Sequence, residues 1–136
     1  MNRASLKSPA TYNAEWLPKR GALNAFSQDM GDCMQDIVLV TMSEFGRTAL
    51  ENGNNATDHG HGSVMFVLGG NVRGGTVCGQ WPGLEKEQLY QGRDLAVTTD
   101  FHSVLSELVT GHMSLKNVAQ VFPGFSPSAP LGLLKS

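Results

Sequence analysis

The residues of this chain that could do chemistry gather in two short segments, Ser43–Thr48 with the sequence SEFGRT and Thr57–Gly62 with the sequence TDHGHG. The second segment places Asp58, His59 and His61 close together along the chain. Histidine, aspartate and glutamate are the usual protein ligands of zinc and related divalent cations. The segment therefore predicts a metal-ligand cluster, with a solvent-exposed polar loop as the alternative.

Glycines separate and follow the two histidines, at Gly60 and Gly62. Because glycine tolerates backbone conformations that other residues avoid, these positions would let neighbouring side chains converge on one ion instead of diverging as in a regular strand. The spacing of His59 and His61 differs from the His-x-x-x-His pattern of helical zinc proteases. The pair therefore predicts a metal site carried by a loop.

The first segment supplies two further candidates, Glu44 and Arg47. Glu44 follows the apolar run Ile37–Val40, which is typical of a short strand buried on both faces. Since ligands collect at the carboxyl ends of strands in open α/β sheets, this carboxylate is a candidate metal ligand. The alternative is an ordinary solvated glutamate. A guanidinium such as that of Arg47 commonly binds phosphate, sulfate or carboxylate, and the alternative is a surface arginine paired with Glu44 or Glu51.

The remaining motifs predict no second chemistry. The glycine-rich segment Gly69–Gly75 fits neither a phosphate-binding P-loop nor the dinucleotide fingerprint, and the Gly-x-Ser-x-Gly elbow of serine hydrolases is absent from the sequence. Turn charges and a helix cap are the expected roles of Arg93, Asp94 and Asp100. Helix-face or helix C-terminal positions are expected for His102 and His112.

Length and charge limit the class of protein. A chain of 136 residues is expected to form one domain. Its net charge of −2 argues against a nucleic-acid partner, which normally meets a basic surface. No apolar stretch reaches the roughly 18 residues of a membrane span, and the start MNRASLKSPATYNAEW lacks the apolar core of a secretory signal. We therefore expect no membrane partner and a cytoplasmic chain, with export of longer relatives left open.

The elements that must position the candidate residues follow from periodicity and turn signals. A helix is expected over residues 21–34, strands at Ile37–Val40 and within Ser63–Gly70, and a long loop over residues 43–63. Farther on, the pattern predicts a short strand within Asp94–Asp100, a helix capped by Thr98, Thr99 or Asp100, and one or two helical turns before Pro123. A helix followed by a buried strand is half of an α/β crossover unit, so we expect a parallel sheet.

Burial and order can also be predicted for the remaining parts. Cys33 and Cys78 are expected to be buried small apolar residues rather than a disulfide. The polar lead-in over residues 1–20 is expected to be poorly ordered, and the proline-rich tail over residues 125–136 to be loosely held.

Two stretches together resemble one bacterial family closely. They are VLVTMSEFGRTALENGNNATDHGHGSVMFVLGGNVRGGTVCGQWPGL, from Val38 to Leu84, and GRDLAVTTDFHSVLSEL, from Gly92 to Leu108. The chain resembles the C-terminal part of the bacterial domain-of-unknown-function family 1501, which is grouped with the alkaline phosphatase and sulfatase superfamily. The resemblance extends from about Gly21 to Gly124, most of the chain.

The resemblance implies a partial alkaline-phosphatase-like α/β sandwich over residues 21–124, with a mostly parallel sheet and long site-forming loops. It also implies that the N-terminal half, with an early metal-binding aspartate and the nucleophile, is missing from this chain. The expected cofactor is a divalent metal, zinc first, with calcium, magnesium and manganese as alternatives. The metal ligands implied are Glu44, Asp58, His59 and His61, with Arg47 as the catalytic oxyanion contact. Because Glu44 replaces the aspartate of the better-known enzymes, the metal and the reaction class stay open.

The expected function is that of a metal-dependent hydrolase-like domain acting on phosphate or sulfate esters, with a small anionic ester as its substrate. Its activity is expected to be weakened, because the half that carries the nucleophile is absent. The alternative is a non-catalytic remnant that binds metal or forms a homo-oligomer covering an exposed sheet face. A weaker third reading is a metal-binding module with a different small-molecule activity.

Overall fold

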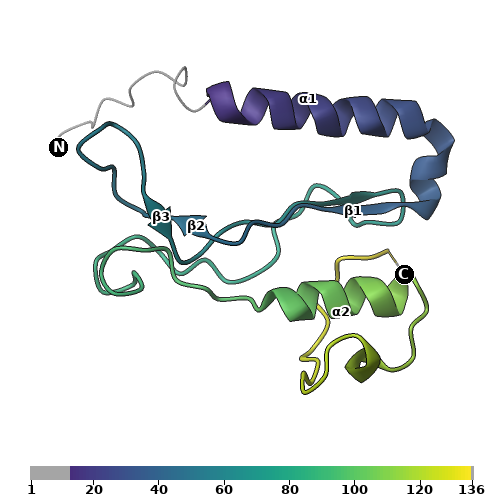
Figure 1. The fold of residues 1–136 in the computed structure, drawn as a ribbon. Helices are drawn as coiled ribbons and strands as arrows, with labels where there is room; N and C mark the ends of the chain where they lie inside the picture. Colours follow the sequence, from purple (N-terminus) through teal and green to yellow (C-terminus); the bar gives the residue numbers. More distant parts are fainter. Residues whose placement is uncertain (1–12, 136) are drawn as a thin grey trace. The chain divides into compact units, whose positions relative to one another are not determined.

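The computed structural model describes residues 13–135, with side chains from residue 21 onward. The chain divides into two compact units, Met1–Met34 and Gln35–Ser136. Helix α1, Asn13–Met30, makes up most of the first unit (purple in Figure 1), and the 3-10 helix η1, Gly31–Asp36, follows it. The helix expected over residues 21–34 therefore begins earlier than predicted and gives way to a tighter helix at Gly31. Residues 1–12 of the expected lead-in lie outside the described residues, and the remainder of it is helical.

The second unit is built on a long antiparallel ribbon. Strand β1, Val38–Val40, pairs with β4, Val67–Gly69, so that Leu39 lies opposite Leu68. Farther along the same two segments, β2, Gly46–Arg47, pairs with β3, His59–Gly60. Figure 1 shows the two pairs following one another along the ribbon, with a loop beyond β2 and β3 that reverses the chain.

The antiparallel pairing shows that the predicted fold class, a mostly parallel α/β sandwich, is wrong. The strands of the described residues are short and form two-stranded antiparallel sheets. Parallel neighbours need a crossover connection of about a dozen residues or more, usually helical. The segment between β1 and β4 instead folds back on itself as a hairpin. The apolar runs that suggested strands buried on both faces are only half-buried.

Helix α2, Phe101–Gly111, packs against one face of this ribbon and holds the core of the second unit. Asp100 caps the helix, because its carboxylate accepts a hydrogen bond from the backbone N–H of His102 at 2.8 Å. This confirms the predicted cap. The buried side chains of Val104 and Leu108 contact Leu133. Partly buried apolar side chains complete the cluster: Val38, Val40, Met65, Val67, Leu131 and Leu134.

The C-terminal segment is fastened to helix α2 by one carboxylate. Glu107 accepts hydrogen bonds from the backbone N–H groups of Leu131, Gly132 and Leu133, at 2.6, 3.2 and 2.5 Å. Leu133 is buried, and its carbonyl accepts a hydrogen bond from the backbone N–H of Arg73 at 2.8 Å. The expectation of a loosely held tail is therefore wrong for this stretch.

The remaining segments and the cysteines agree with the sequence predictions only in part. The helical turns predicted before Pro123 are present as the 3-10 helix η2, Val118–Gln120. The segment Asp94–Asp100 contains no named strand and contributes only isolated bridges at Asp94. Both Cys33 and Cys78 are exposed, so the expectation that they are buried is wrong. Within the described part of the chain, no helix has the length and apolarity that crossing a membrane requires.

Candidate functional site

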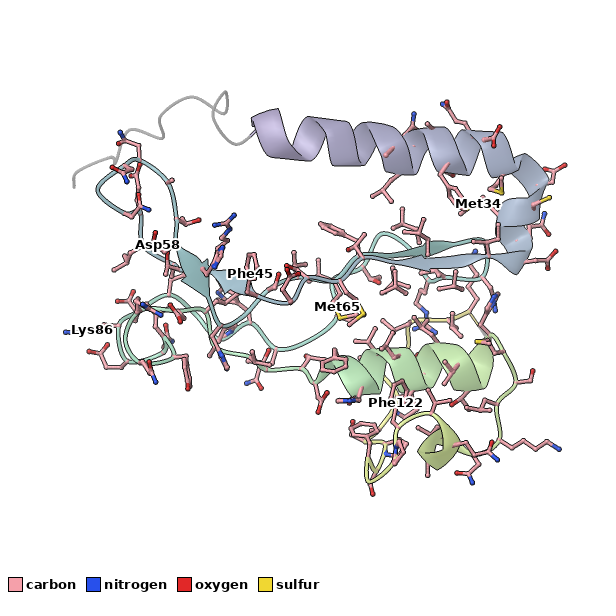
Figure 2. All side chains as sticks on the ribbon, viewed as in Figure 1. Met34, Phe45, Asp58, Met65, Lys86 and Phe122 are labelled. Atoms are coloured by element: carbon pink, nitrogen blue, oxygen red, sulfur yellow. The ribbon has the colours of Figure 1, made fainter. Side chains whose placement is uncertain are left out.

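The β2–β3 hairpin brings the two chemistry-bearing segments side by side. Arg47 lies directly opposite His59 in the strand register, and Gly46 lies opposite Gly60. The pairing continues one residue farther, where the backbone N–H of Thr48 donates to the carbonyl of Asp58 at 3.1 Å. The segments SEFGRT and TDHGHG therefore form one continuous surface, at the end of the ribbon where Phe45 and Asp58 are labelled in Figure 2.

Side chains along this hairpin alternate between two faces. Because successive residues of a strand point to opposite faces, Arg47 and His59, which lie opposite each other, share one face of the strand pair. Phe45, immediately before β2, stacks on His59, with ring centroids 3.8 Å apart. Glycines occupy the alternate positions 46 and 60 within the strands, and Gly62 follows the bend at His61. The strand pair thus presents a guanidinium and an imidazole on one face, next to an aromatic ring.

The glycines are explained by close backbone approach. A Cβ atom on Gly46 would collide with the backbone carbonyl of Gly62, and a Cβ atom on Gly62 would lie 2.6 Å from the carbonyl oxygen of Leu95. The N–H of Gly62 donates to this same oxygen at 2.9 Å. The glycines were expected to bend the chain so that the histidines converge. They instead let the Leu95 segment lie directly against the hairpin, and the chain bends at His61, just after β3.

Each imidazole of the site lies flat against an aromatic ring. The ring of His59 stacks on Phe45 at an interplanar angle of 25°, and the ring of His61 stacks on Tyr90 with centroids 4.0 Å apart and an angle of 17°. The guanidinium carbon of Arg47 lies 5.8 Å from the centroid of Phe45, within the range of a cation–π contact. Stacking occupies the ring faces, so the imidazole nitrogens remain at the ring edges, where a ligand would meet them.

Arg47 is held by its own hairpin. One of its terminal nitrogens donates to the carbonyl of Thr57 at 3.1 Å, and its side chain is exposed. The hydrogen-bond partner is therefore a backbone oxygen rather than Glu44 or Glu51, the partners of the alternative interpretation. The remaining N–H groups of this exposed guanidinium can donate to an anion.

The two acidic candidates lie apart from the histidine edges. The carboxylate of Asp58 accepts a hydrogen bond from the side-chain amide of Asn52 at 2.8 Å, and its backbone N–H donates to the hydroxyl of Thr48 at 3.2 Å. Asp58 therefore closes the loop between β2 and β3. Glu44 is exposed on the bend that precedes β2. Among the described residues, no three His, Cys, Asp or Glu side chains form a group that could hold a metal ion.

The structure thus brings together two of the five predicted site residues, Arg47 and His59, while His61 lies at the bend that follows β3. Two imidazoles would give an incomplete coordination set, which water or a further carboxylate would have to complete around a divalent cation. Glu44 and Asp58 remain predicted ligands that would have to turn toward the histidines on binding.

The turn Tyr90–Asp94, of which only the charged residues were predicted from the sequence, also contacts the hairpin. The segment Tyr90–Asp94 closes on itself through two backbone hydrogen bonds. The N–H of Tyr90 donates to the carbonyl of Asp94 at 2.8 Å, and the N–H of Asp94 donates to the carbonyl of Tyr90 at 3.0 Å. It is bridged to the hairpin at Thr48, and the carbonyl of Arg93 accepts from the N–H of Ala49 at 3.1 Å. No local signal marks Tyr90, since its contact with His61 depends on the tertiary fold.

The two charged residues of this turn, Arg93 and Asp94, bond each other. Arg93 donates two parallel hydrogen bonds to the carboxylate of the buried Asp94, at 2.8 and 3.0 Å. The hydrogen bond and the charge of Asp94 raise the pKa of the Arg93 guanidinium above its usual value, with a smaller contribution from Asp58. The expectation that these residues serve as turn charges agrees with this pairing. Asp94 also anchors the turn that carries Tyr90.

The other two histidines lie outside this face, as expected from the sequence. His102 belongs to the first turn of α2, where its ring bonds the cap residue Asp100 at 2.7 Å, and His112 is the C-cap of the same helix. The backbone and side-chain hydrogen bonds from His102 lower the pKa of Asp100 below its usual value.

Comparison with known proteins supports the resemblance noted in the sequence. The family described as "Protein of unknown function (DUF1501)" matches residues 20–122, which include the whole ribbon, the turn that carries Tyr90 and helix α2. No curated protein and no solved structure shows significant similarity to the chain. Because the match includes well over half of the 136 residues, this chain belongs to the DUF1501 family.

Proposed function

We propose that the end of the hairpin that carries Arg47, His59 and His61 binds a divalent cation, zinc first, together with a small phosphate or sulfate ester. The observation that carries the proposal is the register of the hairpin, which sets Arg47 opposite His59, with His61 two residues farther along the chain. In this proposal the chain is a metal-dependent ester-hydrolase-like domain. Its family resemblance supports placement in the alkaline phosphatase and sulfatase superfamily.

The chain's own residues have distinct roles in this proposal. His59 and His61 offer ring nitrogens at the edges of stacked imidazoles, so little side-chain freedom is lost when they bind an ion. Glu44 and Asp58 are the candidate oxygen ligands. Arg47 directs its free N–H groups at the non-bridging oxygens of the ester and balances their charge. A bound divalent cation supplies Lewis-acid polarisation of the ester and acidifies a water molecule.

One observation favours a second candidate, a metal-binding module without turnover. The described residues hold no group of three potential ligands, so a catalytic metal centre would lack part of its ligand set, whereas binding alone can rest on fewer side chains. In this alternative the exposed apolar side chains along the ribbon, among them Met42 and Val64, would meet a second copy of the chain.

Turnover of nitrophenyl phosphate and nitrophenyl sulfate in the presence of zinc distinguishes the two candidates. The hydrolase proposal expects zinc-dependent turnover that Arg47→Ala lowers about 10-fold or more, because one charge-assisted contact to the reacting oxygens is removed. Arg73→Ala is the matched control, since Arg73 is also exposed and lies outside the hairpin. Zinc binding without turnover supports the second candidate. Turnover that both variants retain in full contradicts the role of Arg47.

A further inference from the structure

Strand β1 has an open edge on the side away from β4. It pairs with β4 alone, so no other strand lies beside it among the described residues. Just beyond the strand, the N–H of Thr41 donates to the carbonyl of Phe66 at 2.9 Å. Bonded and non-bonded residues alternate along an antiparallel pair, so Leu39 also bonds β4. Val38 and Val40 therefore direct their N–H and C=O groups to the open edge.

An apolar groove runs beside this edge. It has a volume of about 160 Å³ and lies between β1 and helix α2, which follow the same stretch of the ribbon in Figure 1. The apolar residues that line it include Val38, Val40, Leu105, Val109 and Met113. Met113 is 70% exposed, so this wall of the groove is open to solvent. The same two valines thus supply side chains to the groove and backbone hydrogen-bonding groups to the edge.

The groove leads into a polar cleft at the start of β1. His112 lines both, and the cleft, of about 780 Å³, is also lined by Asp36 and Gly111. Helix α2 ends at Gly111, and no basic residue in its last turn offsets the partial negative charge of its carbonyls. Asp36 forms no ion pair with any residue that the structure describes. In the same cleft, Nζ of Lys135 donates to the carbonyl of Gly70 at 2.7 Å, so the cleft already holds one ammonium group.

We propose that the open edge of β1 binds an extended peptide of the pattern apolar-x-apolar-x-basic as an added antiparallel strand. The two apolar peptide residues lie opposite Val40 and Val38 and exchange backbone hydrogen bonds with them. Their side chains enter the groove, because paired residues share a face. The basic residue lies two positions farther, at Asp36 and the end of α2, where the charges are complementary. The proposal uses none of the residues proposed to hold the metal or the ester.

The charge of the cleft favours a peptide over a second copy of the chain. Two copies that met through this edge would pair β1 with β1 about a twofold axis. Residues 37–42 carry no charge, so such a pair brings no basic residue to Asp36. A peptide whose basic residue follows its two apolar residues matches the edge, the groove and the cleft together.

Fluorescence anisotropy of a labelled peptide tests the groove and the cleft. The probe is the C-amidated peptide Thr-Val-Thr-Leu-Thr-Lys with a fluorescein at its N-terminus. We expect it to bind, about 10-fold or more tighter than a peptide with serine in place of valine and leucine, because apolar burial is lost. Glutamate in place of the lysine should weaken binding about 5-fold. No binding of the probe, or equal binding of all three peptides, would overturn the proposal.

Protein variants assign the binding to this surface. Asp36→Asn should lower the affinity of the probe about 2- to 5-fold and reduce its preference over the glutamate peptide. Met113→Ser should weaken binding by removing one wall of the groove. Leu84→Ser is the matched control, because Leu84 is also exposed, at 58%, and lies outside the groove and the cleft. Circular dichroism checks that each variant is folded, and folded variants that all bind like the control would refute the assignment.

Two N-methylated probes test the added strand itself. Methyl groups on the valine and leucine nitrogens block the N–H groups that face β1, whereas methyl groups on the two threonine nitrogens that follow them block groups that point away. We expect the first peptide to bind about 10-fold or more weakly than the second. Equal affinities would contradict the strand geometry. A dimer of the chain, detected by sedimentation, that excludes the unmethylated probe would assign the edge to a second copy and overturn the proposal.

Discussion

Removing the Glu107 carboxylate should release the C-terminal segment from helix α2. Its Oε2 atom accepts the N–H groups of Leu131 and Gly132 at 2.6 and 3.2 Å, and its Oε1 atom accepts the N–H of Leu133 at 2.5 Å. Glu107→Ala removes all three acceptor contacts. Glu107→Gln retains one carbonyl oxygen, which can occupy only one of the two acceptor positions, so its effect should be intermediate.

The size of the effect follows from the geometry. A hydrogen bond to a charged group contributes about 1.5 to 3 kcal/mol, but the longest of these three bonds is weak and water can reach the half-buried Leu131 and Gly132 donors after the substitution. We therefore expect Glu107→Ala to lower the free energy of unfolding by about 3 kcal/mol and Glu107→Gln by about 1.5 kcal/mol. For a chain of this size, these losses correspond to falls in Tm of about 10 °C and about 5 °C.

Thermal unfolding followed by circular dichroism measures both falls. Glu87→Ala is the matched control, because Glu87 is exposed, and a surface substitution of this kind changes stability by about 0.5 kcal/mol or less. If the midpoint of Glu107→Ala stays within about 1 °C of the control, the carboxylate does not hold the segment, and the reasoning from these three contacts is refuted.

Two further substitutions test the hairpin and the helix cap. Gly46→Ala should lower zinc affinity about 10-fold or more, because the added Cβ atom would collide with Gly62 and open the β2–β3 pairing. Gly53→Ala is the control, since its Cβ atom would lie in open space, and it should bind zinc normally in calorimetry. Equal zinc affinities of the two variants would contradict the close approach. The lowered pKa of Asp100 means that its extra stabilisation is complete above the unfolded-chain value of 3.8 and is lost as pH falls through the folded-state value. Asp100→Asn keeps a cap that does not titrate. Urea unfolding should therefore show a higher free energy of unfolding for the unaltered protein than for Asp100→Asn at pH 5, and this difference should disappear below about pH 4. A difference that stays constant with pH would argue against the linkage.

Local signals in the sequence predicted the elements well where one short segment decides the structure. The capping carboxylate of Asp100 and the apolar spacing after it placed helix α2 correctly. The run Ile37–Val40 was correctly predicted to contain a strand. The direction of pairing was wrong, because a short apolar run is equally compatible with parallel and antiparallel neighbours. The loop over residues 43–63 decides between them, and its turn back toward β1 was not recognised.

The candidate site was only partly predictable for a related reason. The residue types of Arg47, His59 and His61 marked the two segments, and the hairpin register then explains why Arg47 lies opposite His59. The alternation of glycine with larger side chains in FGR and HGH was a signal of period two that could have indicated paired strands. Nothing local indicated Tyr90, since its place beside His61 depends on a turn far along the chain.

The most direct test of the proposed function is the zinc content and affinity of the purified chain. We expect one zinc ion per chain, bound more than about 100-fold more weakly when His59 and His61 are both replaced by alanine, because loss of two ligands exceeds the effect of losing an orienting partner. His112→Ala is the matched control, since His112 caps helix α2 outside the hairpin, and it should bind zinc normally. Equal zinc binding by the double variant and the unaltered chain would contradict the assignment of this face as the metal site.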